Sequence, residues 1–255
     1  METNSSSRSR VTSKDLKTRL HEHVYTSYLN YSFFIKGAVV GAASLALIGI
    51  FRSPSISFQC VRLVLWCASI GFSVVTIATW NRGSVFTGSR ANYFDLLAPF
   101  LVGIAEMCMF LVLANSAITL PNNAWQYWYA ALSAHSSFAV ILINNRKKQA
   151  RKEDYEESLH QLYDLHMTWL KSDRRGATTL SLMATIILLL TLLLDKFPSI
   201  LDRFQVIIDE FLPTRCLYIV DYTTCIHLVI GCALTALSIC IARKAMRQHQ
   251  LLAEI

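Results

Sequence analysis

The sequence has few residues that interrupt helices and few that carry charge. Among its 255 residues there are only 9 glycines and 5 prolines, and charged residues make up 16% of the chain. Soluble domains average about 25% charged residues. Disordered and collagen-like chains contain far more glycine, proline or charge, so both classes are excluded.

The sequence also lacks the short motifs of common enzymes and metal sites. It contains no GxxxxGK[ST], GxSxG, HExxH or CxxC pattern, and no other nucleophile or metal-ligand constellation is visible. We therefore expect no enzyme activity, no cofactor and no metal ion. The basic residues are not interleaved with aromatic ones as they are in nucleic-acid-binding surfaces, so no nucleic-acid partner is expected.

What the chain does contain is long apolar runs. Apolar residues make up 53% of it, and a membrane-spanning helix needs about 20 of them in succession. Because open backbone cannot face lipid, helices are the only structure that suits such runs. The sequence therefore predicts an all-α integral membrane protein with six transmembrane helices, at residues 33–51, 61–80, 93–115, 124–143, 177–194 and 217–242.

The positive charges predict the orientation of these six helices. If both termini are cytoplasmic, the inner segments hold 19 of the 24 lysines and arginines and the outer segments hold five. Such an excess on one side is the positive-inside signal. The net charge of +7 is thus largely a topology signal, and we expect a multi-pass protein of the cell membrane.

Amphipathic helices are predicted at both membrane faces. Apolar residues recur at helical spacing before the first span, in the second half of the loop at 144–176, and at 195–213 on the outer side. The predicted parts are a cytoplasmic tail and helix at 1–32, four spans within 33–143, a cytoplasmic helical loop at 144–176, two spans with the outer helix at 177–242, and a tail at 243–255. The loop at 144–176 is interpreted as an extension of the fourth span plus a helix lying on the membrane, or as a docking surface for a cytoplasmic protein partner.

Ionisable residues inside the apolar runs are the candidate functional residues, because they are expensive to place in hydrocarbon. Glu106 lies in the middle of the third run, and Asp95 lies eleven residues earlier, on the same helix face. Pro99 lies between the two carboxylates and frees a backbone carbonyl there. His135 lies at a similar depth in the fourth run. A Glu106–His135 pair could carry a proton, coordinate a cation or simply satisfy itself.

His227, in the sixth run, is a further candidate. Serine and threonine stripes accompany it and also occur on the second and fifth runs. Such residues commonly bond to their own helix backbone or allow close helix packing, so we interpret the stripes as packing features.

Two functions from different classes fit these observations. The first is a small channel or carrier for ions, protons or a small solute, which forms a homo-oligomer in the lipid bilayer. In one variant of this function, the protein is a pore gated by a signal that binds at 144–176. Glu106 is then the central charge, His135 its partner and Asp95 the inner mouth. The alternative is a non-transport assembly or interaction factor, in which Glu106 only pairs with another residue.

Overall fold

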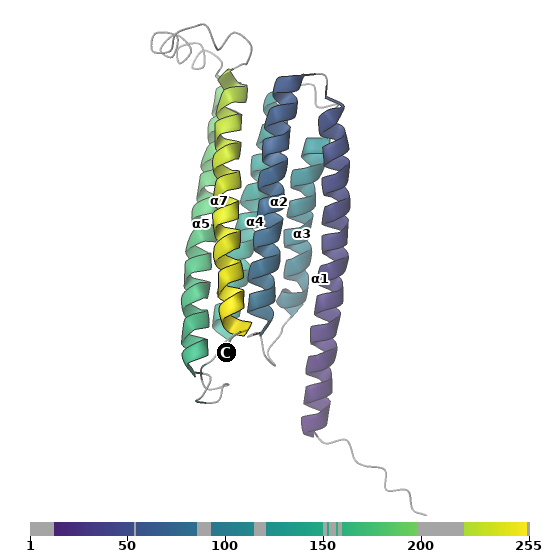
Figure 1. Cartoon of the computed structure of the whole chain (residues 1–255), viewed down its shortest axis with the longest axis vertical. Coiled ribbons are helices and arrows are strands. Elements are labelled where there is room, and N and C mark those ends of the chain that lie inside the picture. Colours follow the sequence, from purple (N-terminus) through teal and green to yellow (C-terminus); the bar gives the residue numbers. More distant parts are fainter. Residues whose placement is uncertain are drawn as a thin grey trace, which may run out of the picture.

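The structure is a computed structural model that describes residues 13–53, 55–85, 93–114, 121–149, 152, 157, 160–197 and 222–253. Within these ranges it is all-helical and contains no β-strand. The long helices are α1 (Ser13–Phe51), α2 (Ile56–Val85), α3 (Tyr93–Ala114), α4 (Pro121–Gln149), α5 (His160–Lys196) and α7 (Tyr222–Ala253). They run side by side as one elongated bundle (Figure 1).

Five of these helices are long and apolar enough to cross a membrane. Their apolar segments are Phe33–Phe51, Phe58–Thr79, Leu97–Ala114, His160–Leu193 and Thr224–Gln248. Large apolar side chains on the outside of the bundle, such as Leu182, Ile186 and Leu189 on α5, are half exposed or more. A continuous apolar exterior of this kind suits a lipid environment rather than water.

The helices form a row and a pair. α1 packs against α3, α3 against α4 and α4 against α5, while α2 and α7 pack closely against each other. Polar contacts from α2 to α4 and from α7 to both α4 and α5 join the pair to the row. α1 therefore forms one edge of the bundle (Figure 1), and α4 lies in its middle.

The core consists of apolar side chains that face from the row toward the pair. Leu65 and Phe72 of α2 meet Phe110 of α3 and Leu132 of α4 in one buried cluster, and each is at most 2% exposed. Small residues allow the closest approaches, as at Gly71 of α2, where an added Cβ would collide with Ser238 of α7. Close packing holds the interior polar residues at fixed positions.

The fourth predicted span forms a helix, but it is not among the five apolar ones. Residues 124–143 lie within α4, which carries serine, histidine and aromatic residues along this length. Many of them are buried against α2, α3 and α5. A helix in the middle of a bundle can be this polar, because its polar side chains face protein rather than lipid.

Several helices are longer than the apolar runs within them. The amphipathic segment before the first span is continuous with it in α1, as predicted. The extension of the fourth span is also confirmed, since α4 continues to Gln149. The prediction of a separate helix lying on the membrane within 144–176 is wrong, because residues 160–176 form the first turns of α5 itself (Figure 1). The predicted outer helix at 195–213 falls largely outside the described residues.

A substitution at Gly49 tests the packing of α1 against α3. A Cβ at Gly49 would collide with the backbone carbonyl of Ala114, which cannot move aside easily, whereas a Cβ at Gly41 of the same helix meets nothing within 4 Å. We expect Gly49→Ala to lower the free energy of unfolding in detergent by about 1–3 kcal/mol. Gly41→Ala is the control and should be neutral or slightly stabilising. Equal effects of the two substitutions would contradict this packing.

Candidate functional site

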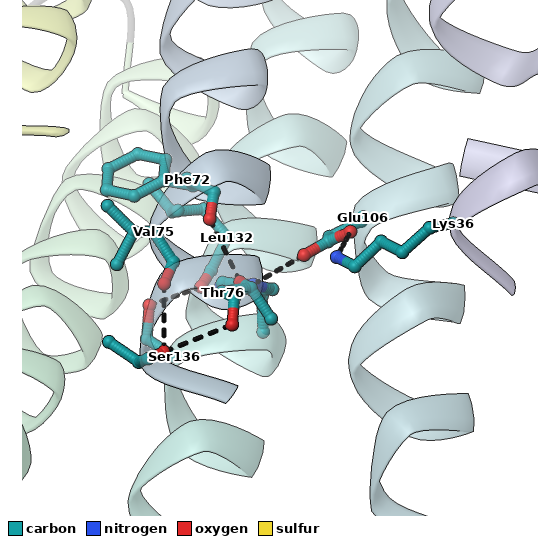
Figure 2. Close-up of polar contacts among 9 residues, drawn as sticks. Lys36, Phe72, Val75, Thr76, Glu106, Leu132 and Ser136 are labelled. Carbon is teal, nitrogen blue, oxygen red and sulfur yellow. Dashed lines mark hydrogen bonds and ion pairs between the residues drawn. The ribbon is translucent and has the colours of Figure 1, made fainter. Parts of the chain in front are cut away.

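Glu106 lies inside the bundle, and its carboxylate has no exposed surface. Lys36 of α1 donates from Nζ to Glu106 Oε2 at 2.5 Å, and His135 Nε2 of α4 lies 3.3 Å from Glu106 Oε1. Figure 2 shows Lys36 and Glu106 extending toward each other from neighbouring helices. One carboxylate therefore joins three helices of the row, and the structure brings together the Glu106 and His135 that the sequence singled out.

The contacts of His135 define where its hydrogen lies. Nε2 is also 3.1 Å from Thr76 Oγ1 of α2. This hydroxyl donates to the Phe72 carbonyl at 2.9 Å, and Figure 2 shows Thr76 and Phe72 on the same helix. Because that hydroxyl hydrogen is already used and an ionised carboxylate only accepts, Nε2 carries a hydrogen that Glu106 and Thr76 share. The other ring nitrogen, Nδ1, is buried and has no hydrogen-bond partner in the described structure.

Lys36 is the member of this group that the sequence analysis missed. Lys36 is one of the 19 basic residues that the predicted topology assigns to the inner segments. In the structure it lies level with Glu106, because α1 and α3 run in the same direction and Ile35 packs against Gly103. The sequence contains an indication of this role, since Lys36 lies within the apolar run that begins at residue 33. A lysine inside a span commonly has a carboxylate partner.

The other predicted residues on α3 lie on its earlier turns. Pro99 is buried, and the helix continues through it without a break. The backbone of Asp95 lies within α3, but its side chain is outside the described part of the chain. The proposed role of Asp95 as an inner mouth therefore stays a prediction.

His227 is not part of the Glu106 group. Its Nδ1 lies 3.0 Å from the Tyr129 hydroxyl, and its ring centroid is 5.3 Å from that of Trp125. Tyr129 precedes His135 by six residues on α4, or about 9 Å along the helix. Trp128, whose Nε1 donates to Ser69 Oγ at 3.1 Å, completes a buried aromatic cluster at this level.

A cavity of about 210 Å³ lies between α2 and α7 on one side and α4 and α5 on the other. At one end it is lined by His135 and its neighbour Ser136, and at the other by Arg146, Asp173 and Lys244. His135 and Arg146 are eleven residues apart on α4, so the two ends are about 16 Å apart. His135 therefore contacts Glu106 on one side and borders the cavity on the other.

Chemically, the group is a charged pair bridged to a histidine. Lys36 balances the Glu106 charge, and histidine is the side chain whose protonation changes most readily near neutral pH. Among the described residues, no three histidine, cysteine or acidic side chains are arranged to hold a metal ion. No family model, curated protein or solved structure shows significant similarity to the chain.

Removing Lys36 tests whether its charge is required by Glu106. Lys36→Met leaves a buried carboxylate with only His135 beside it, so we expect the free energy of unfolding in detergent to fall by about 3–5 kcal/mol. The double variant Lys36→Met/Glu106→Gln removes both charges and should recover most of that loss.

The exposed ion pair between Lys152 and Asp164, with a 2.7 Å separation, provides the matched control. Lys152→Met should cost less than about 1 kcal/mol, because both side chains of this pair are in contact with solvent. The buried pair has no structural importance if Lys36→Met costs no more than Lys152→Met.

Proposed function

We propose that this chain is a six-span carrier of the cell membrane that moves protons, alone or together with a small solute, through the Glu106–His135 pair. The observation that carries the proposal is the position of His135. This side chain contacts the buried carboxylate and also lines the cavity. A titratable group with these two contacts can pass a proton between the cavity and a site inside the membrane.

The direction of α4 supports its assignment as a span in addition to the five apolar ones. Ser133 contacts Thr185 and Ser137 contacts Ser181, so α4 runs antiparallel to α5. The Glu106–His135 contact joins α4 to α3 at the same depth. If α3 and α5 both cross in one direction, the chain must return between them, and α4 is the helix that connects them. Its 29 residues span about 43 Å, which is more than the bilayer requires.

The charges at the helix ends support a cytoplasmic location for both termini. Basic residues are concentrated at the end of α4, early in α5 and late in α7. These segments meet at one end of the bundle, where Lys244 Nζ of α7 donates to Ser172 Oγ of α5 at 2.8 Å. Under the positive-inside rule this end is cytoplasmic, and the cavity then extends inward from the cytoplasm.

The aromatic cluster favours a carrier over an open pore. Trp125, Trp128 and Tyr129 are at most 1% exposed and fill the space between α4 and the α2–α7 pair beyond His135. A hollow inner half and a filled outer half are the arrangement expected of an inward-facing state. Passage to the outer side then requires a movement of these helices, which a carrier undergoes in each transport cycle.

The second candidate is a membrane interaction factor without transport. It is favoured by the Lys36–Glu106 ion pair, because a buried carboxylate neutralised by lysine can be purely structural. Formation of a homo-oligomer, a cytoplasmic partner at 144–176, gating by a signal and the absence of enzyme activity stay predictions of the sequence.

Proton flux into liposomes distinguishes the two functions. We expect purified wild-type protein to conduct protons, and His135→Gln to lower the flux by about a hundredfold, because glutamine keeps hydrogen bonding but does not titrate. The double variant Lys36→Met/Glu106→Gln should have the same effect while remaining folded. His166→Gln replaces a buried histidine of α5 outside the cavity lining and should retain the flux. No flux in the wild type, or full flux in His135→Gln, would refute the carrier.

Reporter fusions test the six-span topology independently of transport. A reporter that is active only in the cytoplasm should be inactive when fused after Ala114 at the end of α3, and active when fused after Gln149 at the end of α4. The two fusions should differ because α4 carries the chain back across the membrane. Equal activity of the two fusions would mean that α4 does not cross, and the six-span arrangement would be wrong.

A further inference from the structure

We infer that the cavity between the α2–α7 pair and the α4–α5 pair binds an anionic amphiphile, with its acyl chain among the apolar walls and its headgroup at the Lys244 end. In the carrier proposed above, this ligand occupies the place of the transported solute, and to that extent the inference rests on the proposed function. Its binding can be measured without any transport assay.

The walls of the cavity suit a hydrocarbon chain. Between its two polar ends the lining is mostly apolar, including Val75, Val102, Leu142, Leu180 and Ile241. A cavity of about 210 Å³ that extends over roughly 16 Å has the elongated form of a single medium-length acyl chain. Burying such a chain contributes about 0.8 kcal/mol for each CH₂ group removed from water.

The charged end of the cavity favours an anion over a cation. Two basic side chains, Arg146 and Lys244, line this end together with one acidic side chain, Asp173. Lys244 is exposed, and its Nζ already donates to the Ser172 hydroxyl, so it is held across the space between α7 and α5. An ammonium in this position can direct its remaining hydrogens toward a carboxylate or phosphate.

The opposite end of the cavity stays polar, which limits the length of the ligand. Thr76, His135 and Ser136 lie there, and Nδ1 of His135 is buried without a hydrogen-bond partner among the described residues. A chain shorter than the cavity leaves room for water to satisfy Nδ1, because buried polar atoms need a partner. A medium-chain amphiphile therefore fits both ends, with its anion at the mouth and water beside His135.

Gly176 lies at an opening through which the ligand can enter the cavity. It lines the cavity, is exposed on α5, and a Cβ added there would meet nothing within 4 Å. α5 packs closely against α4, and α7 against α2, whereas α5 and α7 have few close backbone contacts. An acyl chain can enter between these two helices, either from the bilayer or from the cytoplasm.

The first test uses decanoate as the probe, titrated by calorimetry against the wild-type protein in phosphatidylcholine nanodiscs, with empty nanodiscs as the blank. We expect saturable binding of decanoate and at least tenfold weaker binding of decylamine, which has the same chain and the opposite charge. Adding phosphatidylglycerol to the nanodiscs distinguishes the sources. Competition with decanoate indicates that the headgroup and part of one acyl chain of a bilayer lipid can occupy the site. Absence of competition indicates that the site takes only a free acid, and both outcomes support the site.

Two pairs of matched variants test the location of the site. Gly176→Leu fills the entrance and should weaken decanoate binding about tenfold or more, whereas Gly41→Leu, in equally open space on α1, should not change it. Lys244→Gln should weaken binding about tenfold, while Arg243→Gln, next to it but outside the lining, should leave the Kd within about twofold.

Decanoate binding and proton flux test the ligand site and the carrier separately. The ligand site is overturned if decanoate does not bind the wild type. It is also overturned if decanoate binds Gly176→Leu and Lys244→Gln as tightly as the wild type, even where proton flux depends on His135. Decanoate binding that is lost in both variants supports the site even where liposomes show no flux, in which case the carrier is refuted and the ligand site stands.

Discussion

A carboxylate in the middle of an apolar bundle is the constraint on which the rest of this structure depends. An isolated ionised carboxylate transferred into an apolar medium costs tens of kcal/mol, so Glu106 must have partners. Lys36 approaches one of its oxygens and His135 the other. This requirement sets the register of α1, whose Lys36 must lie level with Glu106. The close approach at Gly49, where α1 meets the Ala114 backbone, allows the two helices to hold that register.

The bundle is asymmetric because α4 changes character along its length. Its first turns carry Trp125, Trp128 and Tyr129, which are large enough to fill the space toward α2 and α7. Its later turns carry smaller residues, such as Ser136 and Ala139, and these border the cavity. Large aromatic side chains bury extensive area in fixed geometry, so one half of the bundle is closed and the other is hollow. Glu106 and His135 lie at the boundary between these halves.

Much of the helical arrangement could be predicted from the sequence, and part of the site as well. Long apolar runs determine most of the helices, and a short connection between the third and fourth runs predicts that Glu106 and His135 lie at a similar depth. The role of Lys36 could not be predicted from spacing, because it depends on how far α1 slides along α3, and neither helix alone specifies that register. In the structure, Ile35 packs against Gly103 at this level. The cavity could not be predicted either, since its lining comes from α2, α3, α4, α5 and α7 and its volume depends on their packing distances.

The two oxygens of Glu106 connect parts of the molecule that have few other contacts. Oε2 is bound by α1, which forms the edge of the bundle and packs mainly against α3. Oε1 faces His135, whose ring borders the cavity. The charge that Glu106 presents to His135 depends on how closely Lys36 approaches, because the attraction between charges is strong in a low-dielectric interior. An edge helix is thereby connected to a residue that lines the cavity through one carboxylate, although no described residue of α1 lines the cavity itself.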